Sequence, residues 1–436
     1  MASADPRGGW ARAAARAAAP SWAHRAELPS ALVSLRHPNY RLLWFGTVVS
    51  NSGDWMDQAA LNWLVYQLSG SAIDLALLNL CRLAPIFVFT LIGGVAADRV
   101  ERRRLMFTTQ SVAMALALIL GALVSTGLVQ IWMVLAIAVG RGIVLSFNQP
   151  ARQSLISELV PRDDLKNAIA LNSATLNLTR VLGPAIGGVL IATVGVAGAF
   201  YVNAATFLAV LYALALMRFP ERLKRGHGSV RGEIAGGFAY LRRQPTLRTM
   251  VLLALLPMVF GMPYMTMLAV MAKDVLRVGG AEFGLMLSCS GVGAVAGSLW
   301  VASRAQSVNL GRAMLAGLVL FGVALLAFAL SRWFWLSVVL LLAVGIGQQV
   351  YTASNNALIQ IRVHEEYRGR VVSTLLLNRG MVPLGTLVAG FGTAAFGVQP
   401  TMAFMAATLV VMALFATYAA RGSDLLDDGA ELGRWS

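Results

Sequence analysis

Long apolar runs separated by short polar segments dominate this chain. Each run holds about 18–25 residues, the length that crosses a bilayer as a helix. The runs are too continuous for barrel strands, which alternate over about 10 residues. The pattern predicts an all-α membrane protein with twelve transmembrane helices in two six-helix bundles. The predicted spans are residues 40–67, 74–97, 105–126, 131–151, 167–193, 197–217, 248–271, 283–303, 311–330, 334–357, 369–396 and 399–420.

The longest polar interruption divides the spans six and six. The predicted domains are a disordered tail (1–38), a first bundle (39–217), a linker (218–247), a second bundle (248–420) and a tail (421–436). The two bundles repeat each other, since Ser154-Leu155-Ile156 corresponds to Ala357-Leu358-Ile359 and the pair Asp163-Asp164 to Glu365-Glu366. Six-span repeats are typical of secondary transporters, whose substrate site lies near mid-membrane between the repeats.

Charge sets the expected orientation. The chain is 58% hydrophobic and only 13% charged, whereas soluble domains are about 25% charged. With the N-terminus inside, only Lys273, Arg277 and Arg332 fall in outside loops. Since cytoplasmic loops collect Lys and Arg, we expect a multi-pass protein of the cell inner (plasma) membrane with both termini cytoplasmic. The net charge of +15 follows from this bias and implies no nucleic-acid partner. Residues 1–36 lack the apolar region of a signal peptide.

Polar side chains recur along the first predicted span. Asn51, Asp54, Asp57, Gln58 and Asn62 follow steps of three and four residues and therefore share one helix face. A charged group at mid-membrane costs about 2.5–3.5 kcal/mol, so this face must meet a cavity or other helices. These acids and the arginines at comparable depth have two interpretations: pairs that hold helices together, or a proton-coupling site and cavity lining. The candidates are Asp54, Asp57, Asn62, Arg82, Arg141, Arg180 and Arg379, with Asp54 the preferred protonation site.

Three motifs resemble those of the major facilitator superfamily. Residues 94–105, predicted to form a short loop, resemble its Gly-x-x-x-Asp-Arg motif through Gly94, Asp98, Arg99 and Arg102. Gly183, Pro184, Gly187 and Gly188 resemble the exporter motif Gly-x-x-x-Gly-Pro-x-x-Gly-Gly, with Thr179 in place of its first glycine. Segments at 52–56, 148–153 and 368–371 resemble the enterobactin-exporter and macrolide-efflux branch. The resemblance implies export, close packing at the glycines, and a cytoplasmic gate in which the loop clasps spans two and eleven.

The sequence favours secondary transport over other functions. None of the three lysines follows a glycine, so a Walker A motif is absent, and the four histidines lack metal spacing. We predict no enzyme activity, cofactor or metal, and a monomer in the bilayer that exchanges protons for small apolar or amphipathic metabolites, siderophores or drugs. The alternatives are a lipid or lysophospholipid flippase of the same fold and a non-transporting membrane sensor.

Overall fold

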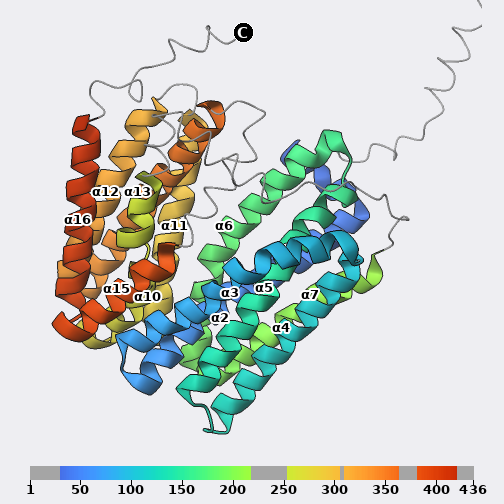
Figure 1. Ribbon diagram of the computed structural model, residues 1–436, viewed down its shortest axis with the longest axis horizontal. Helices are drawn as coiled ribbons and strands as arrows, with labels where there is room; N and C mark the ends of the chain where they lie inside the picture. Colours follow the sequence, from blue (N-terminus) through green and yellow to red (C-terminus); the bar gives the residue numbers. More distant parts are fainter. Residues whose placement is uncertain (1–29, 218–252, 305–308, 363–380, 420–436) are drawn as a thin grey trace, which may run out of the picture.

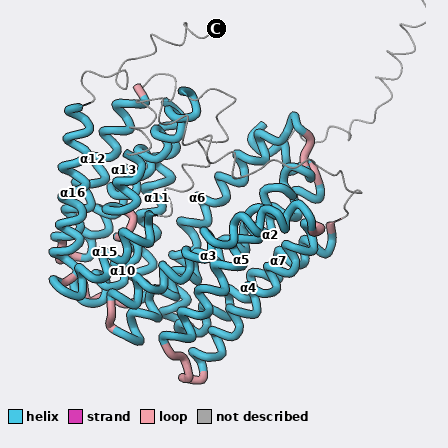
Figure 2. Tube along the Cα trace, in the orientation of Figure 1, coloured by secondary structure: helices cyan, strands magenta, loops and turns pink. Residues whose placement is uncertain are grey.

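The computed structural model describes residues 30–217, 253–304, 309–362 and 381–419. These residues form helices joined by short turns, without a strand among them (Figure 2). In lipid, a backbone must satisfy its N–H and C=O groups within its own segment, which favours helices for these apolar runs.

The first half holds six long helices after a short 3-10 helix, η2 (Ser30–Arg36). They are α2 (Pro38–Ser69), α3 (Ala72–Arg99), α4 (Arg102–Ser125), α5 (Ile131–Leu159), α6 (Arg162–Thr193) and α7 (Gly195–Leu216). The turn after α2 is formed by Gly70, whose φ of +62° lies in the left-handed region and whose N–H donates to Tyr66 O at 3.0 Å.

The second half begins with an irregular span. Residues 253–275 contain η3 (Pro257–Gly261), α10 (Tyr264–Val270) and η4 (Met271–Val275), where η3 and η4 are π-helical turns. Pro257 and Pro263 lack backbone N–H donors, so a regular helix cannot pass through them unchanged. The other helices are α11 (Gly280–Arg304), α12 (Leu310–Leu330), α13 (Phe334–Arg362), α15 (Met381–Phe396) and α16 (Val398–Ala419).

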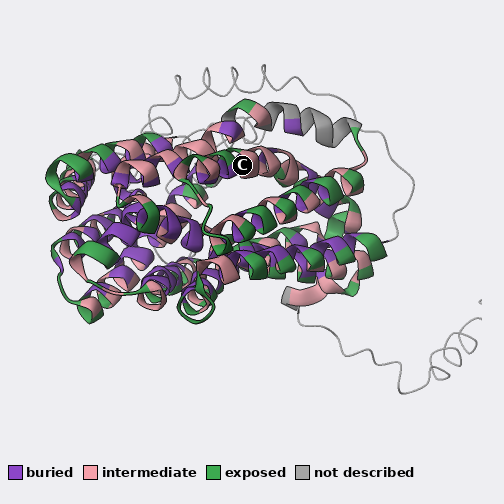
Figure 3. Ribbon diagram, turned by 90° about the horizontal axis from the view of Figure 1, so that it is seen from below, coloured by how far each residue is buried: buried purple, intermediate pink, exposed green. Residues whose placement is uncertain are grey.

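The predicted fold is confirmed. Nine helices in the described ranges are long and apolar enough to cross a membrane, and α2, α3 and α15 bring the set to twelve. Buried and exposed residues alternate around the helices (Figure 3). Large apolar side chains such as Trp335 (71% exposed) and Phe396 (77% exposed) are among the exposed ones, as expected of a protein surrounded by lipid.

The predicted loop at residues 94–105 is largely helical, which corrects the sequence-based expectation. Gly94, Asp98 and Arg99 belong to the last turns of α3, and Arg102 is the first residue of α4. Only Val100 and Glu101 connect the two helices. Charged residues continue a helix beyond the apolar core at little cost because helical backbone satisfies itself, so a change in polarity does not mark a helix end.

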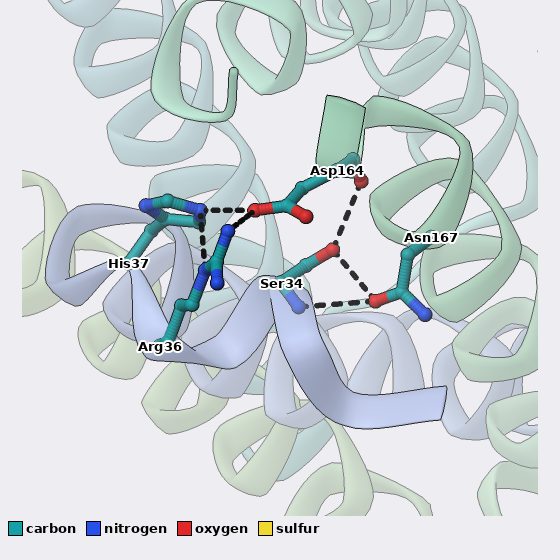
Figure 4. A network of polar contacts seen from close by, with 5 residues as sticks. All are labelled: Ser34, Arg36, His37, Asp164 and Asn167. Atoms are coloured by element: carbon teal, nitrogen blue, oxygen red, sulfur yellow. Dashed lines mark hydrogen bonds and ion pairs between the residues drawn. The ribbon is translucent and has the colours of Figure 1, made fainter. Parts of the chain in front are cut away.

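The expectation of a disordered tail up to residue 38 is wrong for its last part. Residues 30–36 form η2, which packs on the start of α6 (Figure 4). The Ser34 hydroxyl donates to Asn167 Oδ1 at 2.7 Å and to the Asp164 carbonyl at 3.1 Å. Asp164 Oδ2 also accepts from Arg36 at 2.5 Å and lies 2.8 Å from His37 Nε2. Residues 1–29, the predicted linker (218–247) and the predicted C-terminal tail (421–436) lie outside the described residues.

The two bundles meet at one end and diverge toward the other (Figure 1). The contacts join α6 to α11, α3 to α15, and α10 to α2 and α3. At the meeting end the Trp63 and Phe283 rings are 5.3 Å apart, and Asn79 Nδ2 donates to Thr266 Oγ1 at 3.1 Å. The Tyr66 hydroxyl donates to Asp274 there. The divergent end is the one at which α2 begins and α16 ends (Figure 1).

Candidate functional site: a charged cavity in the first half

The polar face of α2 presents two acids in different surroundings. Asp57 is 2% exposed, and its Oδ2 forms an ion pair with Nη1 of Arg141 on α5. Asp54, one turn earlier, is exposed and lines a cavity within the first half. Asp57 is therefore committed to a buried pair, whereas Asp54 remains accessible.

Three arginines surround Asp54. Arg141, Arg82 and Arg152 all act on its carboxylate electrostatically. Arg152 Nη1 also donates to Asn51 Oδ1 at 3.0 Å, which fixes this guanidinium beside the polar face of α2. Two acids against three arginines leave this group with one excess positive charge.

The cavity holds about 600 Å³ of empty space, part of it open to the surroundings. Charged and amide side chains line one part of it and apolar side chains another. The lining residues are Asp54, Asp57, Arg82, Gln110, Ala113, Arg141, Val144, Leu145, Asn148 and Phe207. Such a mixed lining suits an ion-binding group or the polar part of an amphipathic solute.

Sequence reasoning missed several of these positions. Arg152 was expected in a loop because the fourth span was predicted to end at residue 151, but α5 continues to Leu159 and buries Arg152 at 7% exposure. Gln110 and Asn148 interact across α4 and α5, with Gln110 Nε2 at 3.5 Å from Asn148 Oδ1. The available signal was the polar run that includes Asn148 and Arg152.

Not every predicted residue joins the cavity. Asn62 is buried on α2 but does not line it. Arg180 lies between the two halves, where Nη2 donates to Gln348 Oε1 of α13 at 3.2 Å. Arg379 lies outside the described residues.

The glycine motif of α6 makes two different contacts. A Cβ added to Gly183 would lie 2.5 Å from Trp55 Cβ and 2.7 Å from the Ser52 carbonyl oxygen, and one on Gly187 would lie 3.1 Å from the Met56 oxygen; all three of these neighbours are on α2. A Cβ on Gly188 would instead lie 2.7 Å from Gly284 Cα on α11. The kink-permitting Pro184 lies between these contacts. This segment therefore packs on its own bundle and on the opposite one.

Of the Gly-x-x-x-Asp-Arg motif that follows the second span, the structure describes the side-chain contacts of Arg102 only. Arg102 donates to Glu158 of α5, an ion pair within the first half, and Arg104 Nε lies 2.8 Å from Glu101 Oε2. The surroundings of Gly94 and the side chains of Asp98 and Arg99 lie outside the described part of the structure. Elsewhere in the described ranges, no group of three or more His, Cys, Asp and Glu side chains gathers as metal ligands would.

Two six-helix bundles with embedded charges are the architecture of multi-pass membrane transporters built from six-span repeats. The chain belongs to the transmembrane secretion effector family of the major facilitator superfamily, because the model of that family matches residues 29–427. The family resemblance read from the motifs is thus confirmed.

Known relatives agree with this assignment. The chain is 27% identical to the staphyloferrin A transporter of Staphylococcus aureus over 368 residues, which cover 83% of this chain and 91% of the relative. It is also 27% identical to the multidrug efflux pump Tap of Mycolicibacterium fortuitum over 401 residues, covering 88% and 96% of the two chains. The crystal structure of a bacterial homolog of the human lysosomal transporter Spinster, inward-facing and unoccupied, superposes with a TM-score of 0.72 at 18% identity, covering 88% of this chain and 97% of that one. This last likeness concerns the fold.

Proposed function

We propose that this protein is a proton-coupled exporter of small amphipathic molecules, working as a monomer in the cell membrane with both termini in the cytoplasm. The observation that carries the proposal is Asp54: an exposed carboxylate at mid-span in a cavity that Arg82 and Arg141 also line. The relatives named as a staphyloferrin A transporter and a multidrug efflux pump support this proposal, and the glycine motif of α6 favours export.

The role of Asp54 follows from its neighbours. Asp57 is already neutralised by Arg141, so a proton that enters the cavity meets Asp54 as the accessible acid. Protonation of Asp54 removes one negative charge and leaves the arginines more strongly repelling one another. The proposed cycle uses this change to favour one arrangement of the halves over the other.

In the proposed orientation, the divergent end of the bundles faces the cytoplasm. The structure then represents the state that would receive substrate from inside. Outward release requires the contacts at the opposite end to open, among them the Tyr66–Asp274 hydrogen bond.

The test uses purified protein in proteoliposomes with an imposed pH gradient and a clamped membrane potential. Two dyes of similar shape, anionic fluorescein and cationic rhodamine 123, serve as probes, and trapped dye is measured after lysis at one pH. Gradient-driven movement of either dye in the wild type, lost in Asp54→Asn, is the expected result. Asp163→Asn is the matched control, since Asp163 is exposed at the start of α6 outside the cavity. Movement that ignores both the gradient and Asp54→Asn would exclude coupling through this residue, and no movement of either dye would count against transport itself.

A further inference from the structure

Arg180 is a cation at mid-span whose partners in the described structure are neutral. Its Nη2 donates to Gln348 Oε1 at 3.2 Å, it interacts with the Tyr264 hydroxyl, and its buried Nε has no hydrogen-bond partner. Among the ion pairs of the described residues, none includes Arg180. A charge placed at this depth costs free energy on insertion, so an uncompensated guanidinium here indicates a binding group more than a structural one.

Arg180 lies on the stretch of α6 that forms the boundary with the second half. From Gly188 back to Val181, α6 packs closely on α11: a Cβ on Gly291 would lie 3.1 Å from Val181 Cα and 3.2 Å from the Arg180 carbonyl oxygen. The helices α6, α11 and α13 lie around this boundary (Figure 1). The Arg180 side chain is half-buried, so part of it stays exposed at this boundary.

The neighbouring groups of the second half complete an anion site. Gln348 now offers its carbonyl oxygen to Arg180 while its Nε2 donates to Met262 Sδ at 2.7 Å. Tyr264 shares a hydrogen bond of 2.5 Å with Ser290. When a carboxylate takes the guanidinium fork, the Gln348 amide and the Tyr264 hydroxyl become donors to the same anion.

We propose that Arg180 on α6, together with Gln348 on α13 and Tyr264 on α10, binds an anionic group of the transported molecule, so that the substrates are organic anions or zwitterions. This inference rests on the proposed transport function and names its substrate class. Because the ligands come from both halves, a bound anion joins the two halves at their boundary.

This site is separate from the proton site. The arginines that act on Asp54 are Arg141, Arg82 and Arg152, and Arg180 is not among them. An anion in direct contact with Asp54 would promote protonation of that carboxyl group and so favour movement of proton and anion in the same direction. An anion at Arg180 does not have this effect, because it does not touch Asp54. In the proposed antiport, movement of the helices therefore couples the proton to the anion, and direct attraction between the two sites does not.

The experiment compares the two dyes in the proteoliposome assay. The wild type is expected to move fluorescein in preference to rhodamine 123. Arg180→Gln should lower fluorescein transport by about tenfold or more, as expected for loss of a charge-assisted bond, while rhodamine 123 transport stays within about twofold of the wild type. Gln348→Leu should lower fluorescein transport in the same selective way. Arg312→Gln, which removes an exposed arginine on α12, is the control with both dyes unchanged.

Further variants keep the outcome clear if Arg180→Gln folds poorly. Arg180→Lys keeps the charge and loses the bidentate fork, and should retain a weaker preference for fluorescein. Gel filtration and thermal unfolding of each purified variant report on folding. Equal loss of both dyes in well-folded variants, or a wild-type preference for rhodamine 123, would overturn the anion site while leaving gradient-driven transport intact. Movement of neither dye would instead remove the transport proposal on which the site depends.

Discussion

The contact of Gly284 on α11 with α6 is made by backbone atoms, and this makes its disruption predictable. A Cβ on Gly284 would lie 2.5 Å from Gly188 Cα and 2.7 Å from the Pro184 carbonyl oxygen. Carbon atoms pack at about 3.5–4.0 Å, and neither neighbour is a side chain that can rotate away. In Gly284→Ala, α6 and α11 must therefore separate by roughly 1 Å.

The separation penalises one state of the transporter. Overpacking of this kind costs about 1–3 kcal/mol, and in a state where α6 and α11 have parted the added methyl group meets no backbone. If the cost falls on the observed state alone, the equilibrium shifts by about 5- to 150-fold toward the state in which the bundles separate at their meeting end.

The assay is distance measurement by electron paramagnetic resonance between spin labels on the two halves. The chain has two cysteines, Cys81 and Cys289, so replacing both with alanine gives a background for labels at Gln130 and Arg332, exposed residues at the meeting end of each half. The expected result for Gly284→Ala is growth of the longer-distance population.

A second glycine supplies the matched control. A Cβ on Gly322 would lie 2.8 Å from Val410 Cγ2, but α12 and α16 both belong to the second half. Gly322→Ala should therefore lower thermal stability and leave the label distances unchanged. Equal distance distributions for Gly284→Ala and Gly322→Ala would show that the contact of α6 with α11 does not limit opening, and the reasoning would fail.

Three further outcomes follow from other contacts. Asp57→Asn leaves Arg141 buried without its partner and should destabilise the protein by about 3–5 kcal/mol, visible as a lower unfolding temperature; an unchanged temperature would contradict the buried pair. Tyr66→Phe removes the hydrogen bond to Asp274, a bond to a charged group worth about 1.5–3 kcal/mol, and should shift the label distances in the same direction as the glycine variant; shorter distances would refute this. Asp98→Ala should slow dye turnover with membrane insertion intact, whereas normal turnover would remove the gating role read from the superfamily motif.

Span positions were predictable because long apolar runs leave the backbone no alternative to helix in lipid. The ends of the helices were not predictable from hydrophobicity. Hydrophobicity falls at the membrane surface, whereas a helix can continue beyond that surface. Arg152 shows the consequence: predicted to lie outside the fourth span, it is buried in α5 next to Asn51. In the same way Arg102, expected in a gating loop, starts α4 and pairs with Glu158.

The membership of the charged cluster depended on tertiary packing. Asp54, Asp57, Arg82 and Arg141 were predicted from their depth and do line one cavity. Its predicted depth in the membrane also grouped Arg180 with these four residues, but the Arg180 side chain binds Gln348 of the other half instead. Two groups at equal depth need not meet, because depth does not specify which face of a helix points to which neighbour.

The position of α6 explains how two separate sites can act together in the proposed cycle. Gly183 packs against Ser52 and Trp55, the residues that flank Asp54 on α2, and the contact leaves no room for a Cβ. Three residues before that glycine α6 carries Arg180, and five residues after it Gly188 packs on Gly284 of the second half. A shift of α2 caused by a change of charge at Asp54 must therefore move α6, because a backbone contact transmits displacement that a flexible side chain would absorb. In the proposed cycle the same movement alters the anion site and the contact between the halves, so α6 links proton and substrate although they do not touch each other.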